Sequence, residues 1–98
     1  MALLSDEQLR QELRNLGDWT QQDKAIVRQF EFTDFKAAME FVNRIADAAE
    51  SANHHPDITI NYNKVTLLLT SHDSGGVSDR DARMAKKINE VAANKKAA

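Results

Sequence analysis

The sequence contains no cysteine, one proline and three glycines, with only one tryptophan and one tyrosine in 98 residues. A chain without cysteine forms no disulfide and has no thiolate nucleophile, which is typical of proteins in a reducing compartment. No apolar run approaches the roughly 20 residues of a membrane-spanning helix, and the first residues lack a basic region followed by an apolar one. We therefore expect a cytoplasmic protein without a membrane segment.

Excess charge of one sign is also missing, since the formal net charge is -2. Proteins that bind nucleic acids by neutralising phosphates usually carry a clear positive excess. The composition therefore predicts no direct nucleic-acid binding. The length predicts one small domain over residues 1–98. Such a short chain buries only about 60 to 65% of its unfolded surface, so we expect stabilisation by self-association.

The histidines are concentrated in one stretch. All three, His54, His55 and His72, fall within residues 54–72, and the only proline, Pro56, follows the first two. Histidine exchanges protons near neutral pH, because its ordinary pKa is about 6.5, so the cluster is a candidate acid/base site. Pro56 disfavours helix at His55 and predicts that a helix ends just before the pair. The alternative is that the histidines are ordinary polar residues of a loop and a strand end.

The spacing of apolar residues predicts three helices and four strands. Apolar residues three and four positions apart indicate helices, whereas alternation indicates half-buried strands. We expect helices over residues 5–16 and 34–53 and from Ser78 onward, and strands over residues 19–21, 25–32, 58–62 and 65–70. This order predicts an α+β fold, a four-stranded antiparallel sheet with helices packed on one face.

Local signals refine these elements. Ser5 is expected to cap the first helix with Gln8 in a capping box, and Thr33 is expected to cap the second. The second helix should bury one apolar stripe, formed by Phe35, Ala38, Met39, Val42, Ile45, Ala46 and Ala49. Arg28 interrupts the inner face of the second strand, and is expected either at a sheet edge with its head in water or, less simply, as a substrate ligand.

The last two strands predict how the histidines meet. A hairpin turn near Asn63-Lys64 would bring His72 opposite residues 55–57, so the three histidines should converge. Glu50, one turn before His54, is expected either to bond a histidine of the pair or to be solvated. Asp81 is expected either as the capping-box acid of the last helix or also as a residue facing the histidines, and the basic run Arg80–Lys87 as a solvated face.

One spaced pattern covers this whole region: Glu50-x3-His54-His55-Pro56-x5-Tyr62-x9-His72-x8-Asp81. It resembles the signature of the pterin-4a-carbinolamine dehydratases, also called dimerisation cofactors of a hepatocyte nuclear factor. Further matching segments are Tyr62-Asn63-Lys64-Val65, Thr70-Ser71-His72, residues 76–81, Trp19 and Phe30-x-Phe32-x-x-Phe35. The resemblance tips the interpretation of Asp81 toward the histidine cleft and implies association into homodimers or homotetramers.

The resemblance implies that the chain dehydrates 4a-hydroxytetrahydrobiopterin to quinonoid dihydropterin in tetrahydrobiopterin recycling, without a cofactor or metal. We expect His54 and His72 to be the acid/base pair and His55 to orient the pterin, with Asp81, Glu50 and Asn53 as substrate-binding or orienting residues.

Three other interpretations remain open. A metal site could use the three histidines and Asp81, although adjacent histidines rarely reach one ion. The chain could instead be a non-catalytic dimerisation or coactivator module for a transcription factor. It could also regulate an aromatic amino-acid hydroxylase.

Overall fold

A computed structural model describes residues 3–97, and the side chains of residues 3–93. Three helices and four strands follow one another as α1 (Asp6–Leu16), β1 (Thr20–Gln22), β2 (Ala25–Glu31), α2 (Phe35–Ala52), β3 (Asp57–Asn61), β4 (Lys64–Leu69) and α3 (Asp79–Ala97). No helix in this described part is both long and apolar enough to cross a membrane.

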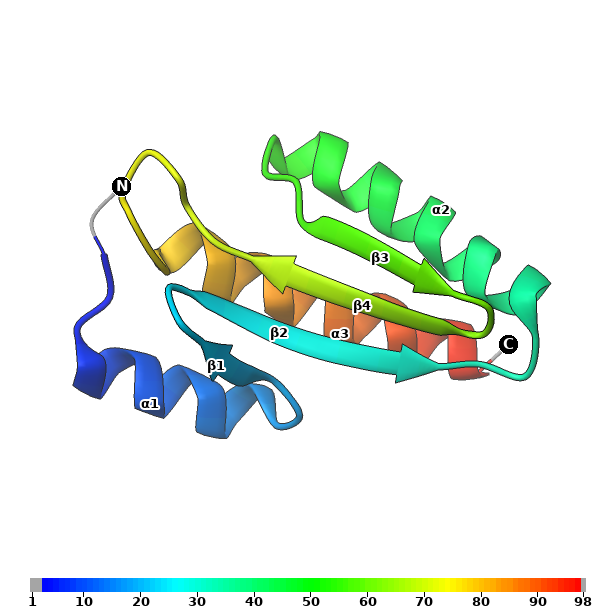
Figure 1. The fold of residues 1–98 in the computed structure, drawn as a ribbon, viewed down its shortest axis with the longest axis horizontal. Coiled ribbons are helices and arrows are strands. Elements are labelled where there is room, and N and C mark those ends of the chain that lie inside the picture. Colours follow the sequence, from blue (N-terminus) through cyan, green and yellow to red (C-terminus); the bar gives the residue numbers. More distant parts are fainter. Residues whose placement is uncertain (1–2, 98) are drawn as a thin grey trace.

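The four strands form one antiparallel sheet in the order β1-β2-β4-β3, which leaves β3 at an edge. α2 and α3 cover one face of this sheet, while α1 lies beside β1 (Figure 1). Between sheet and helices lies the core, whose largest fully buried apolar side chains are Phe41, Ile26, Ile45, Leu67, Leu69, Ile88 and Val65. The predicted α+β fold is confirmed.

The predicted start of α1 is confirmed in detail, because Ser5 and Gln8 form the full capping box. The start of α2 was predicted one residue too early. Asp34, not Thr33, is the N-cap, and its side chain accepts a hydrogen bond from the Ala37 N–H at 2.8 Å. Both residue types cap well, so the local sequence did not separate them.

The buried face of α2 also differs from the predicted stripe. Phe41 is fully buried, whereas Phe35 is 51% exposed. Phe41 packs against the rings of Phe30 and Phe32, with centroids 4.8 and 5.0 Å away. Because Phe35 opens the helix, it lies past the end of this aromatic cluster, and Ala46 is exposed further along.

The β3–β4 turn is shifted by one residue from the predicted Asn63-Lys64, because Tyr62 and Asn63 form it. Tyr62 has a positive φ of 55°, and the Asn63 side chain donates to the Phe32 carbonyl at 2.8 Å. The resulting register pairs Asp57 with Leu68. Continued outward, it brings Ser71 level with His54 and His72 level with residue 53, so the prediction that His72 lies opposite residues 55–57 was wrong.

Arg28 lies just beyond the end of β1, which pairs only with residues 25–27 of β2, so at this position β4 is the only neighbouring strand. Its guanidinium lies 4.2 Å from the centre of the Phe30 ring, donates to Asn89 on α3 at 2.7 Å and approaches Asp18 at 3.4 Å. Asn89 also accepts from the Trp19 indole at 2.8 Å. Arg28 therefore connects the sheet to α3, which corrects the prediction that its head lies in water.

Candidate active site at the histidine end of the sheet

The turn after α2 positions the histidine pair. Asn53 ends the helix in the left-handed conformation, with φ 52°. Asparagine tolerates this conformation better than most residues. The backbone N–H of His54 still bonds to the Ala49 carbonyl at 3.1 Å, and Pro56 then starts the extended chain. This sharp change of direction places one histidine inside the protein and the other outside.

His54 points inward and contacts Asp81 of α3. Its Nε2 lies 2.5 Å from Asp81 Oδ1, and only 10% of the His54 side chain and none of the Asp81 side chain is exposed. The other carboxylate oxygen accepts from Ser71 Oγ at 2.9 Å and from the Ser78 backbone N–H at 2.8 Å. Asp81 therefore accepts from the backbone at the start of α3 and also faces the histidine, which agrees with the second of the two interpretations of this residue.

These hydrogen bonds determine which nitrogen of His54 is available. Asp81 accepts bonds from its neighbours, so we assign the His54 Nε2–H as the donor to Oδ1. The other ring nitrogen, Nδ1, then remains free to exchange a proton with a ligand. A base held by a buried carboxylate in one tautomer is a recurring arrangement in acid/base catalysis.

His55 points outward and contacts Glu50 one turn earlier on α2. Its Nε2 lies 2.5 Å from Glu50 Oε2, and 55% of the His55 side chain and 77% of the Glu50 side chain are exposed. This contact confirms that Glu50 bonds a histidine of the pair. Asn53, between the two, contributes its backbone conformation and has an exposed side chain.

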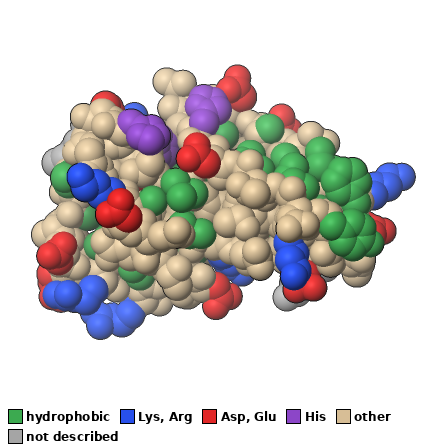
Figure 2. Space-filling view, viewed as in Figure 1, with side chains coloured by type: hydrophobic (Ala, Val, Ile, Leu, Met, Phe, Trp, Pro, Cys, Tyr) green, Lys and Arg blue, Asp and Glu red, His purple; other side chains and the backbone are tan. Residues whose placement is uncertain are grey.

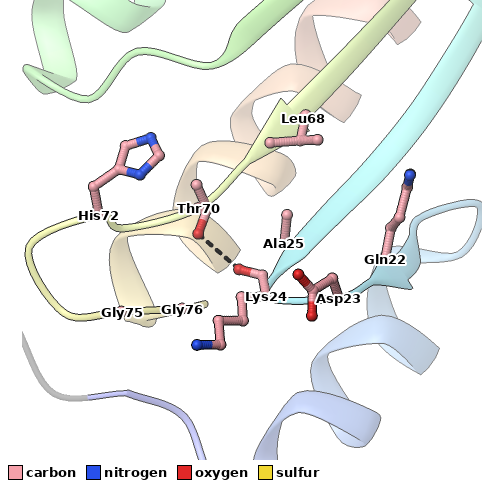
Figure 3. A pocket seen from close by; sticks show the side chains of 9 residues that line it. All are labelled: Gln22, Asp23, Lys24, Ala25, Leu68, Thr70, His72, Gly75 and Gly76. Atoms are coloured by element: carbon pink, nitrogen blue, oxygen red, sulfur yellow. Dashed lines mark hydrogen bonds between the residues drawn. The ribbon is translucent and has the colours of Figure 1, made fainter.

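His72 follows the end of β4 and is exposed. It lines a cavity of about 400 Å³ together with the β1–β2 turn, residues 22–25, and with Leu68, Thr70, Gly75 and Gly76. Thr70 Oγ1 donates to the Lys24 carbonyl at 2.7 Å and so joins the two strands at this cavity. The His72 ring points away from the Lys24 side chain (Figure 3).

Exposed histidine side chains lie near the end of the sheet where β4 ends and β3 begins, with carboxylates nearby (Figure 2), whereas His54 is buried against Asp81 of α3. The pairing of β3 with β4 brings the backbone of all three histidines to this end of the sheet, while the meeting of their side chains in one site stays a prediction. The finer arrangement was not predicted, because His54 lines a different cavity from His72. Sequence reasoning also missed Ser71, which the register places level with His54 and which supports the Asp81 carboxylate.

No group of three or more histidine, aspartate, glutamate or cysteine side chains in the described residues is arranged to hold a metal ion. Adjacent residues on an extended segment point in opposite directions, and His54 and His55 do so here.

The sequence matches the family model for pterin 4 alpha carbinolamine dehydratase over residues 2–91. The chain belongs to this family. A relative from Koribacter versatilis is 56% identical over 88 residues, which are 90% of this chain and 94% of the relative. One from Thermomicrobium roseum is 49% identical over 92 residues, 94% of this chain and 99% of the relative. Both carry the family's enzyme name as a provisional assignment.

Solved structures agree on the fold. A transcriptional coactivator/pterin dehydratase from Brucella melitensis superposes with a TM-score of 0.88 at 37% identity, covering 92% of this chain and 98% of that one. A pterin dehydratase-like protein identified as a RuBisCO assembly factor in the alpha-carboxysome superposes with a TM-score of 0.67 at 20% identity, over 78% of this chain and 90% of that one. At that identity the second likeness concerns the fold alone.

Proposed function

We propose that this protein is a 4a-hydroxytetrahydrobiopterin dehydratase that works by histidine acid/base catalysis. The observation that carries the proposal is that all three histidines flank the same end of the paired strands β3 and β4, in a chain that belongs to the pterin carbinolamine dehydratase family. The product is quinonoid dihydropterin, as needed in tetrahydrobiopterin recycling, and the second product is water.

The reaction needs one acid and one base on the same substrate. The C4a–O bond breaks and the hydroxyl leaves as water after accepting a proton, while N5 loses its proton and the C4a=N5 double bond forms. No electron is exchanged with another reactant, so imidazoles suffice without a cofactor. A histidine near neutral pH can fill either role.

His54 and His72 are the acid/base pair in this proposal, and His55 binds and orients the pterin. Support for His54 comes from its contact with Asp81, which holds the ring through Nε2 and leaves Nδ1 available. Asp81 has no exposed surface, so it acts through His54 as a positioning residue. Glu50 orients His55 in the same way from the outside, and Asn53 sets the turn between them.

The test measures the rate of 4a-hydroxytetrahydrobiopterin dehydration from the change in ultraviolet absorbance. It compares the wild type with His54→Ala and His72→Ala. Each variant should lose about 10² to 10⁴ fold in turnover, as expected for a proton-transfer group. His72 is exposed, so His72→Ala should remain folded and reports on chemistry alone. Near-normal turnover in both variants would contradict the assignment of His54 and His72 as the acid/base pair. A dehydration rate with the wild type no faster than in buffer would contradict the proposed function.

The alternative function is a non-catalytic binding role. It is supported by the similar Brucella structure, which is named both a transcriptional coactivator and a pterin dehydratase. Such a module would bind a transcription factor or an aromatic amino-acid hydroxylase. Co-purification of the wild type with such a partner, combined with no dehydration activity, would support this alternative over the enzyme.

Self-association fits either function, and we propose a homodimer or homotetramer. The edge strand β3 has no partner strand on one side in the described fold, and it carries the partly exposed Ile58 and Ile60. Exposed edge strands pair readily with other chains. Sedimentation should show an oligomer for the wild type and a smaller species for Ile60→Lys; a monomeric wild type would contradict this.

A further inference from the structure

A second cavity adjoins His54, between the end of α2 and the first half of α3. Its volume is about 300 Å³, and its lining residues are Ala52, His54, Arg80, Arg83, Met84 and Lys87. Three of these carry a positive charge, and none of them carries a carboxylate. A cavity of this size is at the lower end of ligand pockets, so it suits one chemical group rather than a whole substrate.

The three cations share one side of α3. Arg80, Arg83 and Lys87 are three and four residues apart, a spacing that stacks side chains along one face of a helix. The neighbouring Lys86 does not line this cavity and instead lines another one with Glu12 of α1, which Arg83 also borders. On the opposite wall, the single methyl group of Ala52 leaves the cations room for a ligand.

Two of these three cations have a carboxylate partner. Arg83 pairs with Asp79 at 3.2 Å, and both side chains are more than half exposed. Arg80 pairs with Asp73 at 2.9 Å across the loop that follows His72. Lys87 has no ion pair among the side chains of residues 3–93, although Asp47 lines the adjoining cavity that shares Lys87. The Arg83 pair is solvent-exposed and therefore weak, so an anion with more charge can replace Asp79.

We propose that this cavity is a subsite for a phosphate monoester group carried by the pterin substrate. Two guanidinium groups offer paired N–H donors that match phosphate oxygens, and an ammonium adds a third charge. His54 belongs both to this cavity and to the histidine motif. A substrate reacting at His54 can therefore extend a tail toward Arg83 and Lys87. This inference rests on the proposed function and names the substrate class as phosphorylated pterins.

The test measures binding of three stable probes: 6-hydroxymethylpterin, its phosphate ester, and inorganic phosphate. Pterin fluorescence gives the first two dissociation constants, and inorganic phosphate is measured by its competition with the ester. For the wild type, the ester should bind about tenfold or more tightly than the unphosphorylated pterin, as expected for charge-assisted hydrogen bonds.

Two matched variants locate the effect. Arg83→Gln with Lys87→Gln should bring the two pterin affinities to within about twofold. Lys64→Gln with Lys86→Gln removes the same charge from exposed positions outside the cavity, and should keep the preference for the ester. Loss of the preference in both double variants would mean that overall charge, not this cavity, binds the ester, and would overturn the proposal.

The remaining outcomes separate the two sources of phosphate and the two proposals. If the wild type binds 6-hydroxymethylpterin and its phosphate ester with equal affinity, the proposed subsite is wrong. If inorganic phosphate nevertheless binds, the cavity takes the free ion and not a phosphorylated pterin. If the unphosphorylated carbinolamine is dehydrated but the ester has no advantage, only the subsite fails. If the ester binds through Arg83 and Lys87 but neither carbinolamine is dehydrated, the subsite stands and the proposed function fails.

Discussion

Two histidine–carboxylate contacts of equal length lie at adjacent positions in this protein, and their surroundings differ. His54 meets Asp81 and His55 meets Glu50, each with an Nε2 to oxygen distance of 2.5 Å. The first pair is buried and the second is open to water. Distance alone therefore does not determine what such a contact contributes.

The difference follows from what surrounds each carboxylate. Asp81 also accepts hydrogen bonds from Ser71 and Ser78, so the loss of any member leaves a buried polar group unpaired. Glu50 can exchange its partner for water at little cost. We infer that the buried pair holds a ring in place, whereas the exposed pair allows His55 to change its contact when a ligand binds.

Removing the buried carboxylate should have the largest effect on stability. Asp81→Ala breaks the contacts to His54, Ser71 and Ser78 together, and should lower the free energy of unfolding by about 3–5 kcal/mol. Urea denaturation measures this. Asp79→Ala, an exposed acid in the same helical turn, is the control and should cost less than about 1 kcal/mol. Equal losses in the two variants would mean that Asp81 acts only as a helix-end charge.

Removing one support of that carboxylate should have an intermediate effect. Ser71→Ala deletes the hydroxyl that donates to Asp81 at 2.9 Å, and should lower the free energy of unfolding by about 1.5–3 kcal/mol. Ser51→Ala, at an exposed position of α2, serves as the control in the same denaturation series. A Ser71 variant as stable as the control would show that the carboxylate does not depend on this bond.

Removing the exposed contact should have the smallest effect. Glu50→Gln should change the free energy of unfolding by less than about 1 kcal/mol, because both partners are mostly solvated. A double-mutant cycle with His55→Ala measures the coupling between the two side chains. A coupling as large as that found for His54 and Asp81 in a parallel cycle would remove the contrast between the pairs.

The sequence predicted the elements and the end of the sheet where the histidines meet, because apolar periodicity, caps and Pro56 are local signals. It missed what depends on tertiary packing. The head of Arg28 was predicted to lie in water, because the packing of α3 against the sheet is not visible in the sequence, and the guanidinium in fact donates to Asn89 of α3. The one-residue shift of the hairpin turn came from Tyr62 adopting a positive φ, which residue preferences disfavour. The inward direction of the His54 side chain and the outward direction of the His55 side chain depend on the left-handed conformation of Asn53.

Nitrogen-15 NMR of the imidazole rings tests the site most directly, because three histidines give only three sets of ring signals. On saturation with a stable dihydropterin, we expect the signals of His72, His55 and Nδ1 of His54 to shift, while Nε2 of His54 keeps its proton toward Asp81. Three unchanged rings in a pterin-saturated protein would contradict a histidine active site at this end of the sheet.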